Sequence, residues 1–225
     1  MIQNEFVTFI TKELDSLKDI PGETLYSSLS TLKKGDIYLM GTNPGGSDNY
    51  LLSKDLEDLK TKTTNGYIDE VWETGRGKPK AGESILQKRV QNLISKIGYD
   101  LKNVCASNLI FTKSKNLETL GYRFKDIADK CWNVHEEILK IVEPKLIIVF
   151  GNGESNSPYS YLKRNYGIQD NNIDLKPIEN NNLNAKSFTF ELNGRKTHVV
   201  GLPHLSRFPI KNDEIYSWIQ NKIKS

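Results

Sequence analysis

The stretch "DIYLMGTNPGGS", residues 36–47, joins a short apolar run to a loop rich in glycine and proline. The run has the form of a buried parallel strand. In the loop, Pro44 fixes its own φ and pushes Asn43 toward an extended conformation. Gly45 and Gly46 allow another backbone or a ligand to come close. The stretch predicts a stiff strand exit that holds the Asn43 side chain at the mouth of a sheet, or else a tight turn whose Asn bonds its own backbone.

Apolar segments of two kinds alternate along the rest of the chain. Short unbroken runs bounded by turn residues predict strands, and apolar positions three or four residues apart predict helices. We expect strands at 36–41, 103–111, 145–153, 187–192 and 197–202. We expect helices at 5–18, 83–98, 120–142, 157–167 and 212–225. Strands that alternate with helices indicate an α/β domain with a mainly parallel sheet.

Two polar segments interrupt this pattern. Residues 47–82 predict a surface insertion with few core residues, and the asparagine-rich residues 169–186 predict a loop. The whole chain, 1–225, is expected to form a single domain that carries this insertion.

Composition limits the classes of protein. No apolar run approaches the roughly 20 residues that span a bilayer, and residues 1–17 lack a signal-peptide pattern. Two cysteines, Cys105 and Cys131, are too few for a disulfide framework or a four-cysteine metal site, so we expect buried thiols. A net charge of +3 permits a nucleic-acid partner without requiring one. These features predict a cytoplasmic protein without a membrane partner, a metal or a cofactor.

Three polar loops follow predicted strands: "GTNPGGS" (41–47), "TKSKN" (112–116) and "GLPHLSRF" (201–208). Ligands of open α/β sheets bind beyond the carboxyl ends of the strands, so these loops are expected to converge on a site. Of the three histidines, His204 lies in such a loop after the stiff Pro203, which favours a catalytic or binding role. His135 lies within a predicted helix and is expected to be structural, and His198 is expected at the surface.

Together these segments resemble the uracil-DNA glycosylase superfamily. "GTNPGGS" is similar to the Gly-x-Asn-Pro-Gly motif of its mismatch-specific and single-strand-selective branches. "LPHLSRF" is similar to the second motif, with Leu205 in place of the usual proline, and "ASNLIF" (106–111) is similar to the strand whose Asn reads the flipped base. The order agrees over about residues 36–210. The resemblance implies a three-layer α/β/α sandwich with a mainly parallel central sheet.

The resemblance also implies roles for individual residues. Asn43 would position the attacking water, and His204 would donate a hydrogen bond to the base as negative charge develops on it. Asn108 would read the base edge beside Thr42. Ser206 would contact a phosphate, and Arg207 or Phe208 would enter the duplex where the base had been.

Several further residues are candidates from their chemistry. Lys113 and Lys115, with the cations at 76, 78 and 80, would offset the cost of base flipping by contacting phosphates, or would be ordinary solvated charges. Tyr67 and Trp72 would stack on the base or form a small satellite core.

The implied activity is that of a monomeric, monofunctional DNA glycosylase that flips out uracil or a modified pyrimidine and leaves an abasic site. The neutral amide of Asn43 is a poor general base, which predicts slow turnover. The long segment 47–82 suggests room for an enlarged base, which would indicate defence against modified phage DNA rather than repair. A nucleic-acid-binding member with weak or no catalysis, and a nucleoside hydrolase, are the alternatives.

Overall fold

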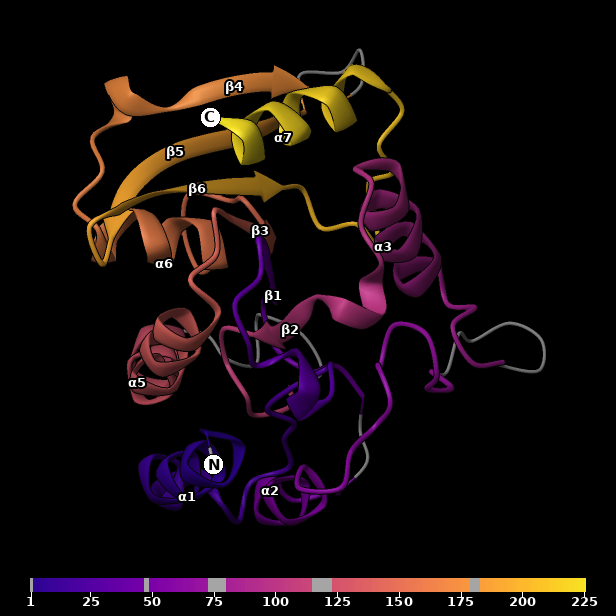
Figure 1. Cartoon of the computed structure of the whole chain (residues 1–225), viewed down its shortest axis with the longest axis vertical. Helices are drawn as coiled ribbons and strands as arrows, with labels where there is room; N and C mark the ends of the chain where they lie inside the picture. The colour runs from indigo at the N-terminus through magenta and orange to yellow at the C-terminus, as the bar shows by residue number, and fades with distance from the viewer. Residues whose placement is uncertain (1, 47–48, 73–79, 115–122, 179–182) are drawn as a thin grey trace.

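The computed structural model describes residues 2–46, 49–72, 80–114, 123–178 and 183–225. Its centre is a six-stranded sheet in the order β2-β1-β3-β6-β5-β4 (Figure 1). The strands are β1 Ile37–Gly41, β2 Cys105–Asn108, β3 Leu146–Phe150, β4 Asp174–Pro177, β5 Asn184–Leu192 and β6 Arg195–Leu202. Strands β2, β1, β3 and β6 are parallel, whereas β5 runs antiparallel to both β6 and β4. The predicted α/β class with a mainly parallel sheet is confirmed.

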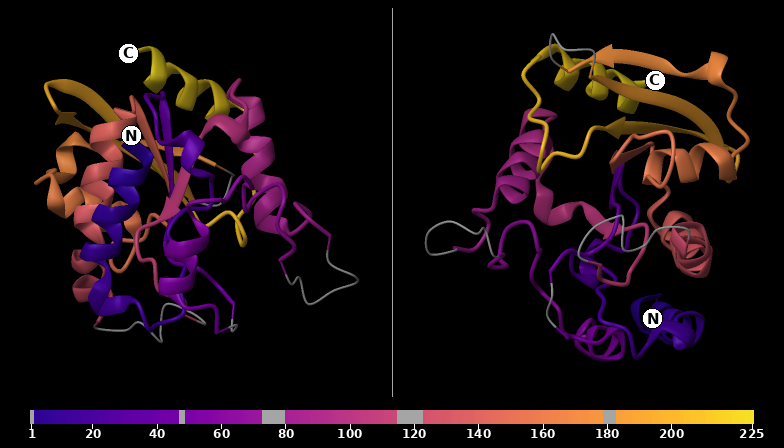
Figure 2. Two further views of the ribbon diagram at one scale, coloured as in Figure 1. Left: turned by 60° about the horizontal axis from the view of Figure 1, so that its bottom comes forward. Right: turned by 180° about the vertical axis from the view of Figure 1, so that it is seen from behind.

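Helices cover both faces of this sheet (Figure 2). They are α1 Ile2–Glu13, α2 Leu52–Asp58, α3 Ile85–Lys96, α5 Phe124–Val142, α6 Pro158–Asn165 and α7 Glu214–Lys224, with short 3₁₀ turns at Asp15–Leu17, Leu29–Thr31, Leu101–Asn103 and Asp170–Asn172. Helices α1, α5 and α6 lie over one face, and α3 and α7 lie over the other. Within the described ranges, no helix is both long enough and apolar enough to cross a membrane.

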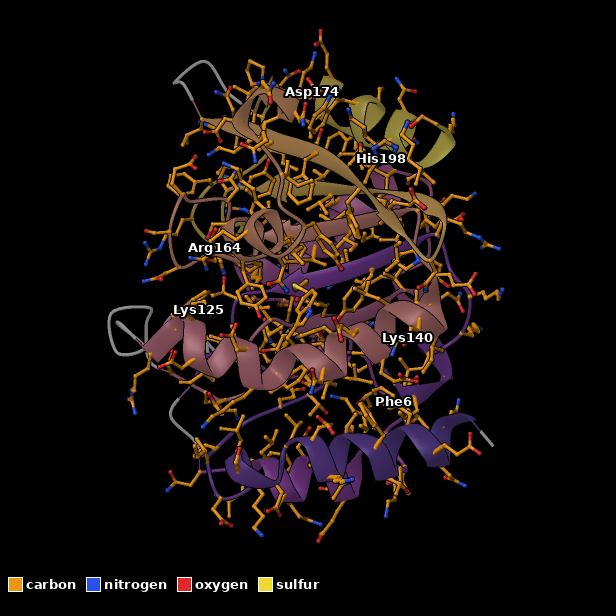
Figure 3. All side chains as sticks on the ribbon, turned by 90° about the vertical axis from the view of Figure 1, so that its left-hand side faces the viewer. Phe6, Lys125, Lys140, Arg164, Asp174 and His198 are labelled. Atoms are coloured by element: carbon orange, nitrogen blue, oxygen red, sulfur yellow. The ribbon has the colours of Figure 1, made fainter. Side chains whose placement is uncertain are left out.

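The strand period of two divides the core between these faces. In β1, Tyr38 and Met40 pack on the side of α1 and α5, while Ile37 and Leu39 pack on the side of α3 and α7. Figure 3 shows the first face, where Phe6 of α1 points toward α5. Because both faces are covered, the central strands are continuous apolar runs.

Local chemistry explains where three of these helices begin or end. Ser84 caps α3 in a capping box with Gln87, and Ser157 caps α6 with Pro158 in the first turn. Helix α5 ends at Val142, followed by a residue at φ 48° and then a proline. Both cysteines are free and buried, as expected.

The expectation of few core residues in 47–82 is wrong. Leu52, Leu56 and Leu59 of the α2 region are at most 4% exposed and pack with α1, and Tyr67 is 1% exposed on the other side. Their apolar spacing is helical, but Lys, Asp and Glu between them make the segment polar on average.

Residues 169–186 are not wholly a loop, because 174–177 form β4 and β5 begins at Asn184. β4 is an edge strand whose residues are largely exposed, so it lacks the apolar pattern on which a sequence prediction depends. His198, expected at the surface, is 5% exposed and bonds the hydroxyls of Thr189 and Ser225.

His135 is structural, as predicted. It is fully buried, and its Nε2 lies 3.0 Å from the Leu109 carbonyl oxygen, which can only accept. Nε2 therefore carries the proton, and Nδ1 accepts from the Tyr38 hydroxyl at 2.9 Å. Burial lowers the pKa of His135 to about 4.

This burial predicts an acid-dependent contribution to stability. The unfolded chain takes up a proton on His135 near pH 6.5 and the folded chain near pH 4, so the stabilisation is complete above pH 6.5 and is lost toward pH 4. The destabilisation caused by His135→Gln should therefore shrink by about 2–3 kcal/mol between pH 7 and pH 4.5. Urea unfolding at the two pH values measures it.

Tyr38→Phe is the matched control, since it removes the bond to Nδ1 but leaves the imidazole buried. It should keep the pH dependence of the wild type. An unchanged gap between wild type and His135→Gln at the two pH values would contradict the assignment of a buried neutral imidazole.

Candidate functional site

The predicted site residues lie at the carboxyl edge of the parallel strands. Asn43 follows β1, Asn108 ends β2 and His204 follows β6. Backbone bonds from Leu109 to Gly41 and from Ile110 to Thr42 join the first two loops directly. β3 lies between β1 and β6, so the loop that carries His204 begins two strand spacings, roughly 10 Å, from the loop that carries Asn43 along the same edge.

Asn108 owes its position to the strand register. It pairs with Gly41 across the parallel β1–β2 ladder, and its Oδ1 occupies the space where a side chain at 41 would begin. A Cβ built on Gly41 would lie 2.1 Å from that oxygen. The glycine thus allows the amide to lie across the end of β1.

The Asn108 amide is 3% exposed, and its Nδ2 has no hydrogen-bond partner within the described part of the chain. Burial raises the pKa of the nearby Tyr26 phenol well above its usual value, and the Asn108 amide acts on that pKa in the opposite direction. No bond of good geometry satisfies Nδ2. An unpaired buried donor costs about 1–3 kcal/mol, so this position is one that a ligand acceptor would stabilise.

The Asn43 amide has a defined orientation. Its Nδ2 lies 2.9 Å from the Pro44 carbonyl oxygen and 2.8 Å from Ser114 Oγ. Because a carbonyl only accepts, the nitrogen must face this side, and both of its hydrogens are used. The Oδ1 atom is therefore the acceptor turned to the opposite side. Both readings of the loop hold in part, since the amide bonds its own backbone and is also fixed at the strand exit.

His204 also has one preferred tautomer. The Ser206 N–H donates to its Nδ1 at 3.3 Å, and the Ser206 hydroxyl lies 2.8 Å from the same atom. Nδ1 is thus the unprotonated nitrogen, and the proton of the neutral ring is on Nε2. Burial and the positive charge of Arg207 lower the pKa of His204, which favours the neutral ring. The site therefore presents an imidazole N–H as a donor.

Two predicted base-binding residues have structural roles instead. The Thr42 hydroxyl donates to the Phe150 carbonyl at 3.1 Å, which ties the β1 exit to β3. Tyr67 is buried against Tyr26 and Trp72, with ring centroids 5.4 and 5.5 Å away. These contacts correspond to the satellite core, and they leave Tyr67 covered rather than open to stack on a base.

The expected DNA-contacting residues of the third loop are at the surface. Ser206, Arg207 and Phe208 are exposed, and the backbone N–H groups of 207 and 208 both donate to the His204 carbonyl. Lys113 is half-buried and lies over the Tyr50 ring at 6.0 Å. Lys115 and the cations at 76 and 78 lie outside the described residues.

A charged cluster that the sequence did not indicate forms around Lys62, whose Nζ also donates to the Leu25 carbonyl oxygen. Lys62 Nζ contacts Glu23 at 2.9 Å and Glu70 at 3.3 Å. Burial raises the pKa of Glu23 to about 8, although Lys62 acts in the opposite direction. Glu23 is 39 positions from Lys62, and all three residues lie in polar stretches, so no pattern marked them. Ser114, which orients Asn43, could have been found from one feature of the sequence, namely its place in the loop 112–116 that was already expected at the site.

Two hollows lie away from these loops, at the amino edge of the sheet. One of about 110 Å³ is bounded by Glu143, Arg195 and Thr197, and one of about 390 Å³ lies beside Thr189 and Lys196. In the first, Arg195 is already paired with Glu143 at 2.6 Å. Neither has a buried unpaired polar atom of the kind that Asn108 provides.

Comparisons with known proteins leave the family open. No protein-family model matches the chain, and no curated protein matches it.

The Gly41 contact yields a test of the site's construction. Gly41→Ala should lower stability by about 1–3 kcal/mol and shift the Asn108 side-chain amide signals, because the new methyl group takes the place of Oδ1. Urea unfolding and ¹H–¹⁵N NMR measure the two effects. Gly45→Ala, in the adjoining loop, meets nothing within 4 Å and is the matched control. Unperturbed Asn108 signals in Gly41→Ala would refute this placement.

Proposed function

We propose that the chain is a monofunctional DNA glycosylase with a uracil-DNA glycosylase-like fold, which hydrolyses the N-glycosidic bond of a flipped-out uracil or modified pyrimidine. The observation that carries the proposal is the buried Nδ2 of Asn108, which has no partner among the described residues, on the strand next to the one whose exit loop holds the oriented amide of Asn43. An acceptor on the base edge would satisfy that donor. The three segments that resemble the superfamily motifs all reach this edge of the sheet.

The chemistry of the bond suits the donors present. Breaking it builds positive charge on the sugar and negative charge on the departing base. The His204 Nε2–H would donate to a base oxygen as that charge develops, and its neutral tautomer makes it a donor without a full positive charge. A preorganised donor of this kind is worth about 10²–10³ in rate.

Asn43 would hold the water that attacks the sugar. With both Nδ2 hydrogens committed to Pro44 and Ser114, its Oδ1 accepts a hydrogen bond from the water and sets its direction. An amide orients water but removes its proton poorly, so bond breaking would precede water attack and turnover would be slow.

The exposed third loop would meet the DNA. Phe208, 37% exposed, would fill the gap left by the flipped base, and Arg207 and Ser206 would contact the backbone nearby. Base flipping costs a few kcal/mol, which these contacts would offset. All three lie in the turn whose N–H groups at 207 and 208 donate to the His204 carbonyl oxygen. The Phe208 side chain and the His204 imidazole would therefore move as one unit.

The substrate is proposed only as a class. Uracil would indicate a role in repair, and an enlarged pyrimidine would indicate action against modified phage DNA. Since Leu52, Leu56 and Tyr67 are buried in the core, residues 49–72 of the segment after the first motif are anchored in the fold, and the pocket's size would be set by packing.

Base release is the direct test. Wild-type protein should form abasic sites in at least one duplex or single strand of a panel that contains uracil, hydroxymethyluracil or modified cytosine. His204→Ala should lower the single-turnover rate by roughly 10²–10³-fold. Asn108→Ala should abolish the preference among bases, because it removes the donor that reads the base edge.

The same panel separates the alternatives. DNA binding without base release from any substrate would favour a non-catalytic nucleic-acid-binding protein, and release from free nucleosides would favour a nucleoside hydrolase. Equal rates for wild type and Asn43→Ala would contradict the role given to that amide.

Ser114 supplies a finer test of the water-orienting step. Ser114→Ala removes an acceptor for Asn43 Nδ2, so the amide loses one of its two anchors. The single-turnover rate should fall roughly tenfold, as expected for imperfect orientation of a reactant, with unchanged affinity for DNA. Ser114→Thr keeps the hydroxyl and should retain most of the rate. A loss of rate equal in both variants would argue against the hydrogen bond as its cause.

A further inference from the structure

The loop that carries His204 is anchored from outside by α3. The guanidinium of Arg89 donates to the Leu205 carbonyl oxygen, and the Leu205 side chain, 1% exposed, packs in the apolar cluster under α3 and α7. Figure 1 shows the chain passing from β6 to α3 before it turns back to α7. Side chain and main chain of Leu205 are therefore both fixed.

The carbonyl that Arg89 holds belongs to the same peptide group as the Ser206 N–H. Peptide groups are planar, so fixing the oxygen also fixes the direction of the hydrogen on the other side. That hydrogen points to His204 Nδ1, 3.3 Å from the Ser206 nitrogen. A continuous line of donors and acceptors thus runs from Arg89 through the 205–206 peptide to the imidazole.

We propose that Arg89 is a positioning residue that sets the tautomer of His204 through the 205–206 peptide. A charged donor on the carbonyl polarises the peptide and strengthens its N–H as a donor, since bonds in a chain reinforce one another. The N–H then holds Nδ1 unprotonated and leaves the proton on Nε2. The use of that Nε2–H toward a base rests on the proposed function, whereas the tautomer itself does not.

Arg89 has firm support for this task. It lies on α3, whose Val90, Leu93 and Ile94 are fully buried. The helix start is fixed by the Ser84–Gln87 capping box, and Gln87 Nε2 also donates to the carbonyls of Gly66 and Glu70. The guanidinium therefore reaches the loop from a rigid platform. The bond from Arg89 restricts the main chain at position 205, where the resembling motif has a proline that would do the same.

The test reads the imidazole directly. In the full chain, ¹H–¹⁵N NMR of His204, assigned with His204→Gln, should show Nε2 protonated and Nδ1 unprotonated. Arg89→Met keeps an apolar stem but has no donor, and should give a mixture of tautomers. Lys88→Gln, which removes a charge from the exposed neighbouring position, should leave the wild-type spectrum. Arg89→Lys, which retains a donor, should restore most of the single tautomer.

A second pair of variants covers the case in which Arg89→Met does not fold. Ser206→Pro removes the peptide N–H on the exposed loop and should give the same mixture, whereas Ser206→Ala keeps the N–H and should retain the single tautomer. A shift in Ser206→Ala alone would assign the tautomer to the hydroxyl and overturn the proposal, as would an unchanged spectrum in Arg89→Met or Ser206→Pro.

Activity then distinguishes this inference from the function. If the chain releases bases, Arg89→Met should slow single-turnover release roughly tenfold while the Kd for DNA stays within about twofold, because a misdirected donor affects the reacting step. A tautomer shift in a chain that releases no base from any substrate would support the Arg89 assignment and refute the glycosylase proposal.

Discussion

The carboxyl edge of the sheet depends on the fact that residue 41 is a glycine, which has no Cβ. The β1–β2 register sets this glycine opposite Asn108, and only without a Cβ can the amide lie across the strand end. Among the described residues this placement leaves the buried Nδ2 of Asn108 without an acceptor, an energetic cost that folding alone would not favour. Such a cost is reasonable where a ligand later supplies the acceptor.

The other polar groups at this edge are oriented by main-chain atoms together with the hydroxyls of Ser114 and Ser206. Asn43 is held by the Pro44 carbonyl, and His204 by the Ser206 N–H. The Thr42 hydroxyl and the Arg89 guanidinium bond carbonyl groups of neighbouring elements. Because the main chain is itself fixed by the sheet and by buried leucines, these side chains are preorganised before any ligand arrives.

Prediction from the sequence succeeded where a repeating pattern coincided with burial. The helix expected at 120–142 and the strands expected at 36–41 and 145–153 correspond to α5, β1 and β3. It failed where the burial of a segment did not produce a recognisable apolar pattern in the sequence. β4 is largely exposed, and α2 together with its C-cap Leu59 buries three leucines separated by charged residues. His198 was misplaced because its cover comes from β5 and the last residue of the chain, Ser225.

For the site, the sequence by itself determined which loops follow strands and which of their residues carry usable chemistry, because strand ends and proline- or glycine-rich exits are local properties. It could not show that Thr42 and Tyr67 are occupied structurally, or that Ser114 and Arg89 orient Asn43 and the His204 loop. Those relations join residues 41 to 116 positions apart, from Tyr26 and Tyr67 to Arg89 and Leu205. Only the tertiary structure decides them, since a hydrogen bond's direction depends on atoms that packing brings together and not on their order in the chain.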